Sequence, residues 1–64
     1  MPRLWPVVTW TAPDGAIGSE VLPADALQAD IDATIREAVA QGGTRIVVRF
    51  CDDAGHCRHR ADYT

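Results

Sequence analysis

Lysine and asparagine are absent from this chain, so every positively charged side chain other than histidine is an arginine. Alanine and aspartate are plentiful instead. This bias is typical of GC-rich coding, and we expect a bacterial or phage origin.

Long apolar runs are also missing. No stretch approaches the roughly 18 consecutive apolar residues that a membrane-spanning helix needs. The N-terminal segment MPRLWPVV lacks the apolar stretch and small-residue cleavage site of a signal peptide. We therefore expect a soluble, cytoplasmic protein that does not interact with a membrane.

The chain has 64 residues and a formal net charge of -3. This length allows one small domain, residues 1–64, and a domain of this size buries a modest core. Such a chain is marginally stable without a staple, a metal or a partner, so a homodimer is a reasonable expectation.

Residues 23–43 carry the clearest helical pattern. Asp25 followed by Gln28 resembles a capping box, and Gly42 with Gly43 offers a left-handed exit. At 100° per residue the apolar arc consists of Leu27, Ile31, Thr34, Ile35, Ala38 and Val39. We expect this arc to face a core.

A hairpin is predicted before the helix. Residues 4–10 are rich in Val, Trp and Thr, and Pro13, Asp14 and Gly15 provide turn residues. A two-residue loop of Asp14 and Gly15 is favoured, because it places Ile17 and Val21 on the face of Val8 and Trp10. A three-residue loop that includes Pro13 is the alternative, and it moves these side chains to opposite faces.

A second hairpin follows the helix. In residues 44–50, Ile46, Val48 and Phe50 alternate with Arg45, Val47 and Arg49, which predicts a half-buried strand. Residues 52–55 form a turn, and residues 56–63 form a fourth, more charged strand. A loop of even length aligns Cys57, His59, Ala61 and Tyr63 with the apolar face of residues 46–50.

The predicted fold class is α+β: a ββαββ chain whose single helix packs on one face of a four-stranded, mainly antiparallel sheet. We favour the strand order 2-1-3-4, because the most apolar strand then lies in the centre and the charged fourth strand at an edge. The alternative order 2-1-4-3 is that of small immunoglobulin-binding domains and other β-grasp folds.

Cysteine and histidine side chains near the second turn could serve as zinc ligands. They are Cys51, His56, Cys57 and His59. The favoured register sends two of them to each face, so we expect unlinked thiols and neither a metal nor a cofactor. Under a three-residue loop Cys51 and Cys57 would be directly opposed, which allows a cross-strand disulfide. A cytoplasmic location disfavours that bond.

Pro2 becomes the N-terminal residue once Met1 is removed. This arrangement resembles small tautomerases of the 4-oxalocrotonate tautomerase type, which use a free N-terminal proline as general base with arginines nearby. The resemblance implies proton transfer next to a carbonyl, with Pro2 as the base. A hairpin before the helix and Pro6 in the supporting strand depart from that pattern, so we expect a protein that is not an enzyme.

The remaining candidate is a surface on the sheet face opposite the helix. The residues that we predict to bind a partner there are Trp5, Arg45, Val47, Arg49, Arg58 and Arg60. Four arginines beside exposed apolar groups have the composition of an interface core, and guanidinium groups tolerate partial dehydration. The alternative interpretation is that these charges only keep an open sheet in solution.

We therefore expect a small interaction module that binds a protein partner or a second copy of itself. A nucleic-acid-binding accessory protein is the first alternative, since bases can stack on Trp5 while arginines contact phosphates. A tautomerase-like enzyme is the second. Homodimerisation could also use the back of the helix, where Ala26, Ala33 and Ala40 recur at heptad spacing.

Overall fold

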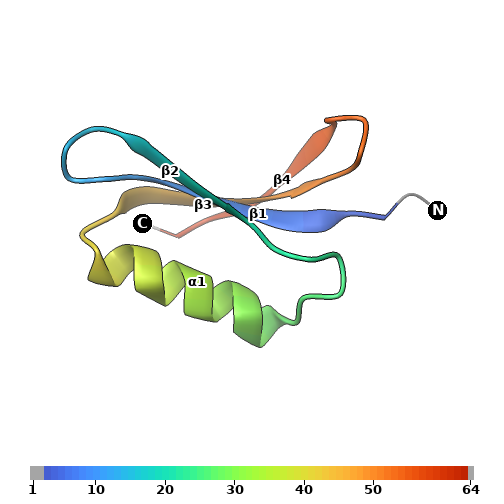
Figure 1. Ribbon diagram of the computed structural model, residues 1–64, viewed down its shortest axis with the longest axis horizontal. Coiled ribbons are helices and arrows are strands. Elements are labelled where there is room, and N and C mark those ends of the chain that lie inside the picture. Colours follow the sequence, from blue (N-terminus) through green and yellow to red (C-terminus); the bar gives the residue numbers. More distant parts are fainter. Residues whose placement is uncertain (1–2, 64) are drawn as a thin grey trace.

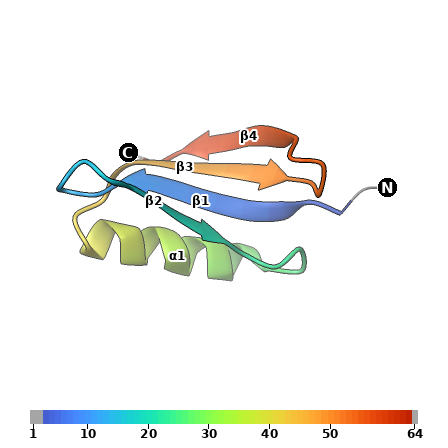
Figure 2. The same cartoon turned by 45° about the horizontal axis from the view of Figure 1, so that its top comes forward.

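A single helix lies against one face of a four-stranded antiparallel sheet in this computed structural model, which describes residues 3–63 (Figure 1). The elements are β1 (Trp5–Thr11), β2 (Ile17–Val21), α1 (Gln28–Ala40), β3 (Thr44–Cys51) and β4 (Cys57–Asp62). The strand order is β2-β1-β3-β4, which places β2 and β4 at the two borders (Figure 2). The α+β prediction and the order 2-1-3-4 are confirmed, and the β-grasp order is excluded.

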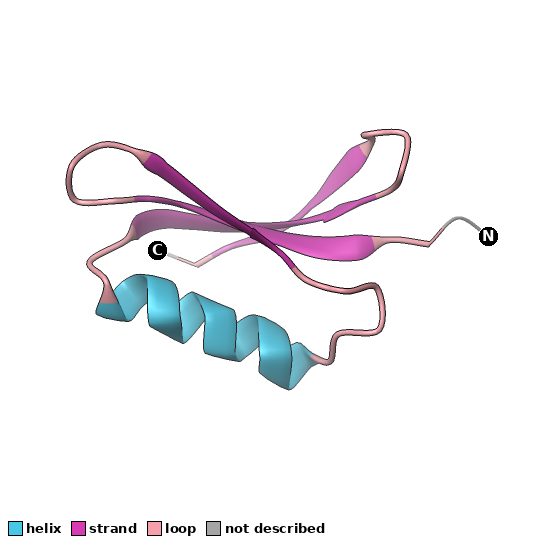
Figure 3. Cartoon of the chain, in the orientation of Figure 1, coloured by secondary structure: helices cyan, strands magenta, loops and turns pink. Residues whose placement is uncertain are grey.

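The core lies between α1 and the central strands β1 and β3. Val8, Ile46 and Val48 are at most 1% exposed, and Ile31 and Ala38 from the helix complete the buried cluster. The alternation predicted for residues 44–50 is therefore confirmed at its even positions. Figure 3 shows that the opposite face of the sheet carries no helix. We call that side the open face.

The helix begins later than the sequence pattern indicates. Leu27 is the N-cap residue, and its backbone N–H donates to the Asp30 carboxylate at 2.9 Å. The expected capping box of Asp25 and Gln28 is therefore wrong, because Gln28 is already the first helical residue. Leucine has no side-chain acceptor, so only the return half of a capping box is present.

The predicted apolar arc of the helix is correct at its centre and wrong at its ends. Ile31, Thr34 and Ala38 are buried, whereas Leu27 is 70% exposed and Val39 is 55% exposed. Leu27 is the N-cap residue and precedes the first helical turn, and Val39 lies at the margin of the arc, 100° from the buried Ala38.

The exit from the helix follows the prediction. Gly42 has a φ of 82°, which is the left-handed conformation that favours glycine. Its N–H donates to the Val39 carbonyl, and the Gly43 N–H donates to the Ala38 carbonyl at 2.8 Å. These two bonds form a Schellman motif and turn the chain into β3.

The first hairpin has a three-residue loop, so the favoured two-residue loop is wrong. Thr11 lies opposite Ile17, and the Ala12 N–H donates to the Ala16 carbonyl around a loop of residues 13–15. A two-residue loop would need a ladder hydrogen bond from Pro13, which has no N–H to donate. Gly15, with a φ of 88°, supplies the left-handed third residue of this loop type.

The second hairpin also has a three-residue loop, residues 53–55, so the predicted loop of even length is wrong. The Asp52 N–H donates to the His56 carbonyl, and Gly55 has a φ of 84°. The Asp52 carboxylate accepts the N–H groups of Ala54 and His56 at 3.0 and 2.9 Å.

Within residues 3–63 no helix is long and apolar enough to cross a membrane.

Candidate interaction surface

The register of the four strands fixes which side chains occupy the open face. They are Ile17, Ser19 and Val21 of β2; Trp5, Val7, Thr9 and Thr11 of β1; Val47, Arg49 and Cys51 of β3; and Cys57, His59 and Asp62 of β4. Directly opposed residues of an antiparallel pair point to the same side of the sheet. One surface therefore collects side chains from all four strands.

The open face carries more apolar side chains than we predicted from the sequence. Ile17 is 72% exposed and Val21 is 61% exposed, and both come from β2, where the three-residue loop directs them away from the helix. Val21 lies opposite Val7, and Trp5 and Val47 are half-buried on the neighbouring strands. Contiguous exposed apolar side chains with a polar rim are typical of interaction sites.

Arg49 lies within this apolar surface and is exposed. Its Nη1 donates to the Thr9 hydroxyl at 3.4 Å, which holds the guanidinium across β1. Among residues 3–63 the ion pairs join only histidine to aspartate, the shorter being His59 to Asp62 at 3.3 Å. The guanidinium therefore has no carboxylate partner in the described part of the chain.

The predicted partner-binding residues separate into two groups. Trp5, Val47 and Arg49 share the open face, as predicted. Arg45 is exposed at a bulge opposite Trp10, with a φ of 52°, and lines a shallow hollow with Val47 and Asp62. These four residues lie on or beside one surface.

Arg58 and Arg60 do not lie on the open face, so their predicted placement is wrong. Arg58 is opposite Phe50, and the guanidinium of Arg60 is 5.9 Å from the centre of the Phe50 ring. The three-residue loop in the second hairpin shifts the register by one residue, which exchanges the faces of residues 57–59. Both arginines and Phe50 line a hollow of about 360 Å³, together with Leu4 and His59.

A bulge in β4 limits this exchange. Arg49 lies opposite His59 but Val48 lies opposite Ala61, so one extra residue, Arg60, is inserted. Ala61 therefore returns to the side of the helix, as predicted, while Cys57 and His59 remain on the open face.

Cys51 and Cys57 form a disulfide, which corrects the expectation of unlinked thiols. The two residues are directly opposed, with their Cα atoms 4.0 Å apart. Trp5 lies opposite Cys51 on the other side, so the bond and the indole share one end of the open face. The sulfur atoms are bonded to each other, and among residues 3–63 no three metal-ligating side chains come together.

The apolar residues Ile17 and Val21 were missed as site residues, because the favoured loop directed them to the core. Pro13 was the available signal, since its missing N–H disfavours the shorter loop. Pro2, the base of the tautomerase hypothesis, lies outside the described residues.

Comparison of the chain with protein-family models, with curated proteins and with solved structures gives no match.

Proposed function

We propose that the chain is a small protein-interaction module that docks on another protein through the open face of its sheet. One observation carries this proposal: three adjacent strands direct exposed or half-exposed apolar side chains to the side without a helix. Ile17, Val21, Val7, Val47 and Trp5 supply them. Burying such a group against a partner contributes roughly 25 cal/mol for each Å² of apolar surface.

Arg49 gives this surface a chemical preference. Its guanidinium has five N–H donors and, within residues 3–63, one side-chain hydrogen bond, the long one to Thr9. A partner that places a carboxylate beside apolar side chains would form a charge-assisted pair with Arg49. The proposed partner is therefore a protein surface with apolar side chains around an aspartate or glutamate.

A photoreactive amino acid tests the docking surface directly. Placed at His59, which is exposed on the open face, it should give adducts with a partner protein from the source cell. The same group at Arg36, exposed on α1, is the matched control and should give none. Val47→Asp and Arg49→Glu, each combined with the His59 probe, should abolish the adducts. Equal labelling from both positions, or no labelling from His59, would contradict the proposal.

Disulfide formation bears on the location of this module. Disulfides persist in oxidising compartments and are rare in the cytosol. The Cys51–Cys57 bond therefore supports an oxidising environment over the cytoplasmic location expected from the sequence. Thiol trapping of the protein from its native cell would decide between the two.

Nucleic-acid binding is the second candidate, and the hollow around Phe50 favours it. Arg58 and Arg60 flank an aromatic ring there, as in sites that stack bases and contact phosphates. Binding of a single-stranded oligonucleotide should then weaken steeply with salt and be lost in an Arg58→Ala/Arg60→Ala variant. Retained binding in that variant would reject this hollow as the site.

A further inference from the structure

The two border strands of the sheet differ in how they are protected. β4 carries Arg58, His59, Arg60 and Asp62 and is interrupted by a bulge. Charges and bulges on an edge strand prevent it from pairing with another chain. β2 is short and regular in its pairing with β1, and Glu20 is its only charged residue. This edge lacks the devices that protect β4.

The main-chain groups available at the β2 edge follow from its pairing with β1. The Leu22 N–H donates to the Pro6 carbonyl, and the Ala12 N–H donates to the Ala16 carbonyl. Hydrogen-bonded pairs alternate with non-hydrogen-bonded pairs along an antiparallel ladder. The main-chain groups of Gly18 and Glu20 therefore also form hydrogen bonds with β1. The N–H and C=O groups of Ile17, Ser19 and Val21 therefore point away from the sheet.

A second β2 strand, running antiparallel, matches this edge in one register. With Ser19 opposite its own copy, Ile17 lies opposite Val21 of the second copy, and Val21 opposite its Ile17. All the outward groups of these residues then form reciprocal hydrogen bonds, six in this pattern. The paired apolar side chains all lie on the open face.

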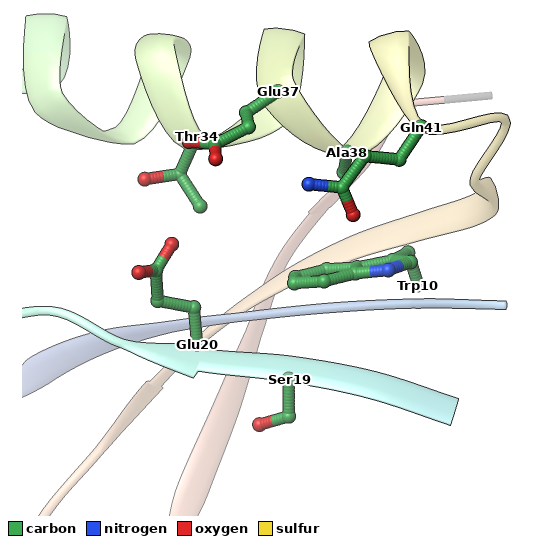
Figure 4. A pocket seen from close by; sticks show the side chains of 7 residues that line it. All are labelled: Trp10, Ser19, Glu20, Thr34, Glu37, Ala38 and Gln41. Carbon is green, nitrogen blue, oxygen red and sulfur yellow. The ribbon is translucent and has the colours of Figure 1, made fainter. Parts of the chain in front are cut away.

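Charge favours the same register. Glu20 points toward the helix and Ser19 away from it, as Figure 4 shows beside the hollow that Trp10 and Glu37 help to line. With Ser19 at the centre, each Glu20 lies opposite Gly18 of the other copy. A shift by one position on each strand toward the C-terminus would put the two Glu20 side chains directly opposite each other, which is destabilising.

We infer that two copies of the chain associate through their β2 strands, in the Ser19-centred register, to form one continuous eight-stranded sheet. The association extends the open face across both copies and joins their Ile17 and Val21 side chains into one apolar strip. It uses an edge that the proposed docking function does not require. Only a few residues of each chain contact the other, well below the roughly 20–30 of a standard interface, so the dimer dissociates on dilution.

Salt distinguishes this association from one driven by arginine. The two Glu20 residues are diagonal neighbours across the new pair, with their backbone positions about 7–8 Å apart. Their repulsion is screened as ionic strength rises, whereas hydrogen bonds and apolar contacts persist. The dimer therefore becomes tighter with salt, and Glu20→Gln tightens it by about twofold.

The test begins with sedimentation equilibrium over about a hundredfold concentration range, where the mass should rise from one chain to two. Ser19→Pro removes the outward N–H without touching a bond to β1, and it should weaken the dimer by at least about tenfold. Ser19→Ala keeps the N–H and is the matched control. Ser19→Lys, which places two like charges in contact, serves if the proline variant does not fold.

NMR identifies the register itself. In a mixed sample of labelled and unlabelled chains, a filtered NOE should join the Gly18 Hα of one copy to the Glu20 Hα of the other, since non-hydrogen-bonded pairs are the closest. A protein that stays monomeric throughout would overturn the inference. So would a dimer that Ser19→Pro does not weaken, or an NOE between the two Glu20 residues. None of these results depends on the outcome of the His59 labelling experiment.

Discussion

Replacing Gly18 with alanine tests the register of the first hairpin. A Cβ at Gly18 would lie 2.3 Å from two atoms of the Trp10 indole and 2.6 Å from a third. The indole has no free space to move into, because the Gly43 backbone already lies close to it: an added Cβ there would be only 3.0 Å from the ring. Ala38 of the helix packs nearby (Figure 4). The ring is therefore held between the sheet edge and the end of the helix.

Two opposing effects set the expected change in the free energy of unfolding. Forcing an extra methyl group into a packed site costs about 1–3 kcal/mol. Alanine in place of glycine within a strand returns roughly 0.5–1 kcal/mol, because the unfolded chain loses less entropy. We expect Gly18→Ala to lower the free energy of unfolding by about 1–2 kcal/mol. For a domain of this size that corresponds to a fall of roughly 4–15 °C in Tm.

Urea unfolding at dilute protein concentration measures this loss, and the Trp10 indole N–H resonance should shift. Ser19→Ala is the control, because Ser19 points to the open face and its truncation should change stability by less than about 0.5 kcal/mol. Under the two-residue loop Gly18 would lie opposite Thr11 on the other face of the sheet, so Gly18→Ala would add no contact with the indole. Equal stability of Gly18→Ala and the parent, with an unchanged indole signal, would refute the reasoning.

Three further perturbations probe other parts of the fold. Ile46→Val removes one methylene from a side chain with 0% exposure and should cost about 0.5–1.5 kcal/mol in urea unfolding, whereas a neutral result would contradict its place in the core. Reducing the Cys51–Cys57 bond reopens a loop of six-residue separation and should lower stability by up to about 2 kcal/mol, as read from unfolding with and without reductant. Gly42→Ala forces a left-handed φ of 82° on a residue with a Cβ and should cost about 1 kcal/mol, visible as a lower thermal midpoint by circular dichroism.

Local patterns in the sequence were sufficient for the element order and the core of the fold. The alternation around Ile46 and Val48 predicted which side of β3 is buried, because a strand directs successive side chains to opposite faces. Gly42 predicted the helix exit, because a left-handed residue is needed there. Even the central position of β3 followed from its apolar character. Each of these inferences depends on residues close together in the chain.

Local patterns did not predict the start of the helix correctly. Asp25 and Gln28 have the spacing of a capping box, but the chain reserves residues 23–27 for the connection from β2, and the Ala26 N–H closes a turn on the Pro23 carbonyl. The Asp30 carboxylate instead accepts the Leu27 N–H, and the helix begins at Gln28. The turn that connects β2 to α1 therefore moves the start of the helix beyond Asp25.

The sequence by itself determined a two-hairpin, one-helix fold and the buried parity of β3, because those features are set by local periodicity and turn residues. Only the tertiary structure decided which side chains share the open face. That choice depends on loop length. A one-residue change in the first hairpin exchanges every side chain of β2 between the two faces, and the same change in the second hairpin exchanges the side chains of β4 that precede its bulge. This is why Ile17 and Val21 joined Trp5 and Arg49, while Arg58 and Arg60 went to Phe50 on the other side of the sheet.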